Sequence, residues 1–238
     1  MTDFSYRGPV MVFDLDDTLA PEHLYLMSAF RFAEKYLKNI LLPKGIDIKE
    51  GEIVTLMDAA LPQGPFYYDA LERWLESKGI TPEEIMPELV AAVHDHKPDN
   101  GYALDSLTRQ VLDTLRSRGV RMALITDGRS NTQRRKIEAL GLYDYFHPEL
   151  IFISGEQGAD KTKPDSFIKV VRSFPEAASF TYTGDNPAKD FEHPNLLGWE
   201  TYCLMASPEG KNIFMQPDRP YPFGAQHKIF SLENLLLP

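Results

Sequence analysis

Apolar and polar positions alternate along most of the chain with two periods, one typical of buried strands and one typical of helices. Strands are expected at residues 10–13, 120–125, 150–153, 178–183 and 200–205, and the first three of these segments are short apolar runs. Segments with an apolar residue at every third or fourth position lie between them, at residues 104–118, 131–140 and 164–173. Strands that alternate with helices of this length predict an α/β fold, a Rossmann-like doubly wound parallel sheet with right-handed crossovers.

The region from about residue 22 to residue 94 has helical spacing and no convincing strand. The breaks that divide it into four expected helices are Gly45, residues 61–65, and Gly79 with Thr81-Pro82. We therefore expect a helical domain at residues 21–102, inserted after the first strand of a core formed by residues 1–20 and 103–238.

Two further segments carry local signals. The last inserted helix is expected to begin at Thr81, with Pro82 in the first helical position and Glu84 completing a capping box. The tail after Pro208 is rich in proline, glycine and aromatic residues, and it predicts no clear element.

Composition is ordinary for a globular protein, with 43% hydrophobic and 25% charged residues among 238. The net charge of −10 argues against nucleic acid or an anionic membrane as a partner, because both require clustered lysine and arginine. The single cysteine, Cys203, excludes an internal disulfide and is expected to be a small buried side chain. Residues 1–8 lack the apolar core of a signal peptide and no segment is long enough to span a membrane, so a cytoplasmic location is expected.

Three acidic residues, Asp14, Asp16 and Asp17, follow the first expected strand within four positions. Ligands of open α/β sheets gather outside the carboxyl ends of the strands, which is where these acids lie. Their mutual repulsion would be relieved by a hard divalent cation with oxygen ligands, most simply Mg²⁺. The alternative is a solvated acidic turn that caps the following helix.

Polar residues also follow or precede three later elements. They are Thr126, Asp127 and Gly128 after the strand at 120–125, Lys163 at the start of a helix, and Asp185 and Asp190 after the strand at 178–183. A hydroxyl and turn amides can hold a phosphate oxygen, and a lysine can neutralise developing negative charge. Each of these three features alone is typical of a turn or of the surface. Together with the acids after the first strand, and in this order along the chain, they indicate one site.

The sequence resembles the haloacid dehalogenase superfamily from about Val10 to Leu204. The four motifs of that family are matched by Asp14-Leu15-Asp16-Asp17-Thr18, Thr126, Lys163-Pro164 and Gly184-Asp185 through Asp190. The inserted helices resemble the family's cap domain. Dehalogenases of the superfamily lack an acid at the position of Asp16, so the resemblance implies the phosphatase branch.

The resemblance also implies a role for each residue. Asp14 would be the nucleophile that forms an aspartyl-phosphate, and Asp16 would be the general acid and base. Mg²⁺ would be held by Asp14, the backbone carbonyl of Asp16 and Asp185, with Asp190 as an indirect or water-mediated contact. The groups expected to hold the phosphoryl oxygens are Thr18, Thr126, Asp127, Gly128 and Lys163.

The expected substrate is a small phosphorylated metabolite, such as a nucleotide, a sugar phosphate or a glycolate-type phosphate, and the oligomeric state stays open. One alternative is a phosphomutase, which would use the same residues. The other is a non-enzymatic sensor of a phosphorylated ligand, which could function without Asp16 or Lys163. Residues 94–99, which include two histidines and two aspartates, are interpreted as a polar hinge and not as a metal site. The basic residues 134–136 are interpreted as a solvated helix face.

Overall fold

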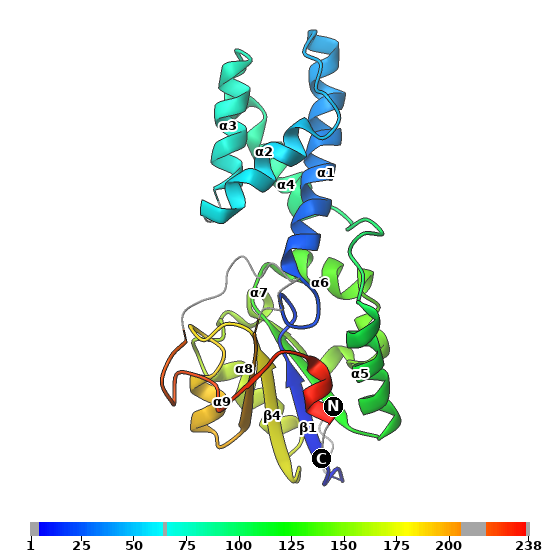
Figure 1. The fold of residues 1–238 in the computed structure, drawn as a ribbon, viewed down its shortest axis with the longest axis vertical. Coiled ribbons are helices and arrows are strands. Elements are labelled where there is room, and N and C mark those ends of the chain that lie inside the picture. Colours follow the sequence, from blue (N-terminus) through cyan, green and yellow to red (C-terminus); the bar gives the residue numbers. More distant parts are fainter. Residues whose placement is uncertain (1–4, 64–65, 206–217, 237–238) are drawn as a thin grey trace. The chain divides into compact units, whose positions relative to one another are not determined.

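The computed structural model describes residues 5–63, 66–205 and 218–236 of the chain. The chain divides into two compact units (Figure 1), each described by itself below. The core unit comprises Met1–Glu22 and Ala103–Pro238, and the helical unit comprises His23–Tyr102.

A six-stranded parallel sheet with the strand order β3-β2-β1-β4-β5-β6 is the centre of the core unit. Its strands are β1 (Pro9–Phe13), β2 (Arg121–Thr126), β3 (Ile151–Ile153), β4 (Ser179–Gly184), β5 (Glu200–Leu204) and β6 (His227–Ile229). This confirms the predicted α/β fold with a helical insertion after the first strand. The chain order reverses between β1 and β4, and that reversal is where open α/β sheets bind their ligands.

Helices cover both faces of this sheet. They are α5 (Ser106–Ser117), α6 (Ser130–Ala139), α7 (Ser154–Gln157), α8 (Asp165–Ser173) and α9 (Glu192–Leu196). Figure 1 shows α5 on one side of the sheet and α8 with α9 on the other. Because both faces are covered, neighbouring residues of the central strand β1, Val10 to Phe13, are all buried.

Aromatic side chains dominate the core between the sheet and α8. Phe167 of α8 meets the rings of Tyr182 and Trp199 edge-on, with ring centroids 5.3 and 5.8 Å apart. Cys203 belongs to the same buried cluster, as expected for a lone cysteine in an apolar run. Rigid packing beneath the carboxyl ends of β1 and β4 fixes the positions from which the polar loops start.

The helical unit contains the four α-helices that were predicted. They are α1 (Glu22–Leu41), whose first residue belongs to the core unit, α2 (Glu52–Ala60), α3 (Tyr67–Ser77) and α4 (Met86–His94). The expected start of α4 at Thr81 is wrong, because Pro82–Glu84 forms a separate 3₁₀ turn and Thr81 makes no side-chain cap.

The tail holds structure that the sequence pattern did not predict. Residues 227–229 add β6 to the sheet edge, and the 3₁₀ helix η6 (Leu232–Leu236) packs against α5. The part of the expected tail at 209–217 lies outside the described residues. No helix in the described part of the chain is long and apolar enough to cross a membrane.

Candidate active site

The carboxyl ends of β1 and β4 place two acidic residues side by side. Asp14 follows β1, and its amide donates to the Thr183 carbonyl at 2.9 Å, which extends the pairing of the two strands by one step. Asp185 follows the last residue of β4, Gly184. The sheet itself therefore sets the spacing between these two acids.

A third acid completes a buried cluster. Ligand atoms of Asp14, Asp185 and Asp190 all lie within 4.8 Å of one another, and all three side chains are buried. Asp190 is held by the Asn186 amide, which donates to its Oδ2 at 2.8 Å. Three buried carboxylates at this spacing form the hard oxygen donor set that Mg²⁺ prefers. The residues present therefore fit a divalent cation.

Lys161 lies inside this cluster, with a side chain that is 1% exposed. Its Nζ is 2.7 Å from Asp14 Oδ2 and 2.6 Å from Asp190 Oδ1. Burial alone would lower the pKa of Lys161, but the two carboxylates outweigh it and hold that pKa well above its usual value. Burial also raises the pKa of Asp14 to about 6, although Lys161 opposes the shift.

Lys163, the lysine expected in this position, is exposed. The loop after α7 explains the difference. Asp160 makes a turn in which its side chain accepts from the Thr162 amide and its carbonyl accepts from the Lys163 amide, both at 3.0 Å. The Lys161 amide donates to Asp127 Oδ1 at 3.1 Å, which anchors that residue beside the end of β2. The loop therefore directs Lys161, and not Lys163, into the cluster.

The turn after β2 carries the other expected phosphate-binding groups. Thr126 is buried at the strand end. Asp127 forms an ion pair with Lys189, whose Nζ lies 3.1 Å from Asp127 Oδ2, and the sequence pattern did not indicate a role for this lysine. Gly128 is in the left-handed half of backbone space, with φ +143°, and its amide donates to Ser154 Oγ at 2.9 Å. That amide is thus already paired in this structure.

Thr18 and Asp16 lie in the tight loop that leads from β1 to α1. The Thr18 hydroxyl, expected to hold a phosphoryl oxygen, is buried and has no hydrogen-bond partner among the described residues. Asp16 is contacted by Gln133 and Lys136 of α6. The interpretation of residues 134–136 as a solvated face is therefore wrong for Lys136, which is 2% exposed.

Residues 94–99 do not form a second metal site in the described part of the chain. His96 is buried, with Nδ1 2.6 Å from the Val93 carbonyl and Nε2 3.3 Å from Ser28 Oγ. Asp99 forms an ion pair with Arg31 at 2.6 Å. These groups are satisfied within the helical unit.

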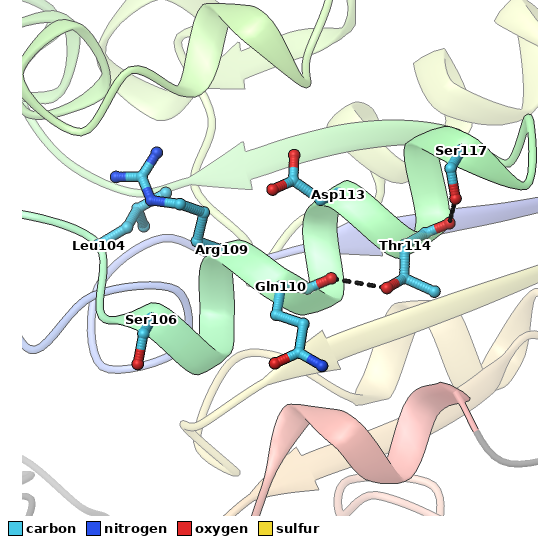
Figure 2. Close-up of a pocket in the computed structure, with 7 residues that line it drawn as sticks. All are labelled: Leu104, Ser106, Arg109, Gln110, Asp113, Thr114 and Ser117. Carbon is cyan, nitrogen blue, oxygen red and sulfur yellow. Dashed lines mark hydrogen bonds between the residues drawn. The ribbon is translucent and has the colours of Figure 1, made fainter.

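A separate open hollow of about 630 Å³ lies along α5 and shares no residue with the acidic cluster (Figure 2). Its lining residues are Leu104, Ser106, Arg109, Gln110, Asp113, Thr114 and Ser117. The Thr114 and Ser117 hydroxyls donate to carbonyls of the same helix at 2.7 and 2.8 Å. Asp113 pairs with Arg116 at 2.8 Å, and we assign no ligand to this hollow.

Comparison with known proteins matches the haloacid dehalogenase-like hydrolases over residues 9–192. The chain is 30% identical over 217 residues to a glyceraldehyde 3-phosphate phosphatase of Methanopyrus kandleri, covering 87% of each. It is 29% identical over 236 residues to a glyceraldehyde 3-phosphate phosphatase of Pyrococcus furiosus, covering 97% of this chain and 92% of the relative. A phosphoserine phosphatase of Thermus thermophilus is 35% identical over 138 residues, 57% of this chain and 53% of the relative.

Solved structures show the same fold. A putative β-phosphoglucomutase of Thermotoga maritima superposes with a TM-score of 0.61 at 19% identity, covering 96% of each chain. A putative hydrolase of Bacillus subtilis, determined with bound magnesium, gives a TM-score of 0.59 at 21% identity, covering 96% of this chain and 97% of the other.

Proposed function

Because the chain belongs to the haloacid dehalogenase-like hydrolases, we propose that it is a Mg²⁺-dependent phosphatase acting on a small phosphorylated metabolite. The observation that carries the proposal is the buried group of Asp14, Asp185, Asp190 and Lys161. Three carboxylates and one ammonium leave two negative charges, which a divalent cation would balance. Such a cluster is costly to bury unless a positive ligand compensates it.

The proposed metal ligands are Asp14, Asp185 and the backbone carbonyl of Asp16. Bound Mg²⁺ would supply positive charge that stabilises the phosphoryl oxygens in the transition state. Asp190, which is fully buried and is held by Lys161 and the Asn186 amide, is assigned the indirect contact that the family resemblance implies. Lys161 adds a second, permanent positive charge beside Asp14.

The proposed reaction has two steps. A carboxylate oxygen of Asp14 attacks phosphorus, the bond from phosphorus to the leaving oxygen breaks, and that oxygen takes a proton from Asp16. Asp16, now ionised, removes a proton from water, and the water oxygen attacks the phosphorus of the aspartyl-phosphate. The bond from phosphorus to the Asp14 oxygen breaks, inorganic phosphate leaves and the Asp14 carboxylate is restored.

A triose phosphate is the substrate that the relatives favour. Both glyceraldehyde 3-phosphate phosphatases align over most of this chain, whereas the phosphoserine phosphatase aligns over little more than half of it. We therefore propose glyceraldehyde 3-phosphate, with phosphoserine as the second candidate.

Phosphate release tests the proposal. The wild type is assayed with glyceraldehyde 3-phosphate, phosphoserine, a nucleoside monophosphate and a hexose phosphate, each with Mg²⁺ and with EDTA. We expect Mg²⁺-dependent release that is fastest with glyceraldehyde 3-phosphate and is abolished by Asp14→Asn. Release that persists in the Asp14→Asn variant would overturn the mechanism. Phosphate transfer that needs a bisphosphate activator, with little net release, would instead identify a mutase.

A further inference from the structure

Both carboxylate oxygens of Asp16 are contacted by side chains of one helix. Oδ1 lies 2.7 Å from Lys136 Nζ, and Oδ2 accepts a hydrogen bond from Gln133 Nε2 at 2.9 Å. We infer that Gln133 and Lys136 are positioning residues that hold Asp16 in the orientation needed for proton transfer to the leaving group. This inference rests on the proposed phosphatase function.

The two residues act from the same face of α6. They are three positions apart, so their side chains are neighbours on the helix surface. Both are buried, with 1% of Gln133 and 2% of Lys136 exposed. Ile137, on the same face, is fully buried and fixes this face of α6 against the core. Packing therefore fixes the positions of both donor groups, whereas a side chain at the surface would be mobile.

The surroundings of Gln133 determine how its amide is oriented. Besides Asp16, its Nε2 lies 2.6 Å from Thr126 Oγ1 and 3.0 Å from the Asp127 carbonyl. The Asp127 carbonyl can only accept hydrogen bonds, so the NH₂ group of Gln133, and not its amide oxygen, must face it. Gln133 thereby links Asp16 to the end of β2, where the phosphate-binding turn begins.

Lys136 is a charged group whose burial requires compensation. A helical lysine ordinarily extends its ammonium into water, and a lysine 2% exposed without partners would be costly. Its Nζ lies between two carboxylates, 2.7 Å from Asp16 and 3.6 Å from Glu22. Removing the charge would leave Asp16 without its closest cationic contact.

The backbone at Asp16 is already fixed by the loop, so the α6 contacts act on the side chain. The Leu15 carbonyl accepts from the amides of both Leu19 and Ala20, at 2.9 and 3.2 Å, and Asp17 has a left-handed φ of +54°. Because these hydrogen bonds fix the backbone, the Asp16 side chain can still rotate, and Gln133 and Lys136 restrict that rotation.

The test compares two leaving groups in the Lys136→Met and Gln133→Met variants. Glyceraldehyde 3-phosphate or phosphoserine, whichever the wild type hydrolyses faster, has an alkoxide leaving group that needs a proton. The leaving group of p-nitrophenyl phosphate needs little proton assistance. Misplacement of a catalytic group by about 1 Å can cost roughly 10²-fold, so we expect kcat for the alkyl phosphate to fall about 10- to 100-fold and kcat for p-nitrophenyl phosphate to fall about threefold or less.

A double-mutant cycle then asks whether Lys136 acts through Asp16. Adding Lys136→Met to Asp16→Asn should not change the ratio of alkyl to aryl rates any further, because the group being positioned is already lost. The Lys35→Met and Gln110→Leu variants are matched controls on exposed helical positions and should retain the wild-type ratio. Thermal unfolding and the Mg²⁺ concentration for half-maximal activity are measured for every variant.

Equal losses on both substrates in the single variants would overturn the inference, because they would indicate a structural role alone. A further fall of the ratio in the double variant would also overturn it. If Lys136→Met does not fold, Lys136→Gln, which keeps a hydrogen-bond donor, is expected to show the same selective loss to a smaller extent. Absence of activity in the wild type would count against the proposed function and not against this pairing.

Discussion

The ammonium of Lys161 lies 2.7 Å from Asp14 Oδ2 in the interior of the core unit, at the end of the central strand β1. The contact depends on a long-range anchor, because the Lys161 amide donates to Asp127 beside the end of β2. Lys161 is therefore a fixed positive charge beside the proposed nucleophile. Lys163, two residues later, is exposed.

Replacing Lys161 by methionine should nearly abolish phosphatase activity, whereas Lys163→Met should leave it close to wild type. Removing one preorganised charge-stabilising donor costs about 10²- to 10³-fold in kcat, and we expect Lys161→Met to lower kcat by that factor or more. The variant should also unfold at lower temperature in EDTA, because breaking a buried ion pair typically costs about 3–5 kcal/mol. Steady-state kinetics and thermal unfolding of the two variants check this prediction. Comparable losses for both lysines would contradict the assignment.

Gly184 at the end of β4 should resist substitution for a reason specific to the site. A Cβ at this position would lie 2.5 Å from Asp190 Oδ2, so Gly184→Ala must displace the Asp190 carboxylate. We expect a raised Mg²⁺ requirement in an activity titration, together with a lower unfolding temperature. Gly119→Ala is the matched control, because it adds a methyl group in open space at a left-handed φ of +71°. It should cost about 1–2 kcal/mol of stability without changing the Mg²⁺ requirement.

Strands β1, β2 and β3 were predictable because each is a short, largely buried apolar run. Strand β6 was not predicted because two of its three residues, His227 and Lys228, are polar and exposed. A sheet edge needs little apolar pattern, because backbone hydrogen bonds to β5 define it.

The choice between Lys161 and Lys163 could not be made from the sequence. Both precede Pro164, and the decision depends on the Asp127 contact, which joins residues 34 positions apart. Lys136 is different, because a signal was present. Helical spacing puts Lys136 and Gln133 on the same face of the helix as Ile137 and Leu140, which are both buried apolar residues. The position of Lys136 on this face indicates that it is buried too.

Glu34 should be important for the stability of the helical unit. Its Oε1 accepts from the Gly51 amide at 2.9 Å and its Oε2 accepts from the Ile53 amide at 3.1 Å, so it caps the start of α2 from α1. Lys38 pairs with the same carboxylate at 2.8 Å. Glu34→Gln should cost about 1–3 kcal/mol in chemical denaturation. Glu72→Gln, at an exposed position of α3, should change stability by less than about 0.5 kcal/mol. Equal effects of the two substitutions would exclude the capping role.

Asp17 should make the metal-free protein less stable as the pH rises towards neutrality. Burial raises the pKa of Asp17 to about 7, whereas the unfolded chain should titrate near the usual value of about 3.9. Between these values the folded state binds more protons than the unfolded state, so stability is lost with increasing pH. Asp14, whose pKa burial raises to about 6, acts in the same direction.

The Asp17→Asn variant isolates this effect. Asparagine tolerates the left-handed φ of +54°, and its side-chain oxygen can still accept from the Glu22 amide, as the Asp17 carboxylate does at 2.9 Å. We expect unfolding temperatures in EDTA to fall between pH 5 and pH 8 for the wild type and to fall less for the variant. Mg²⁺ bound as proposed would compete with the proton for Asp14, so it should raise the unfolding temperature more at pH 8 than at pH 5 in both proteins. Parallel pH profiles of the two proteins in EDTA would show that deprotonation of Asp17 does not cause the loss of stability.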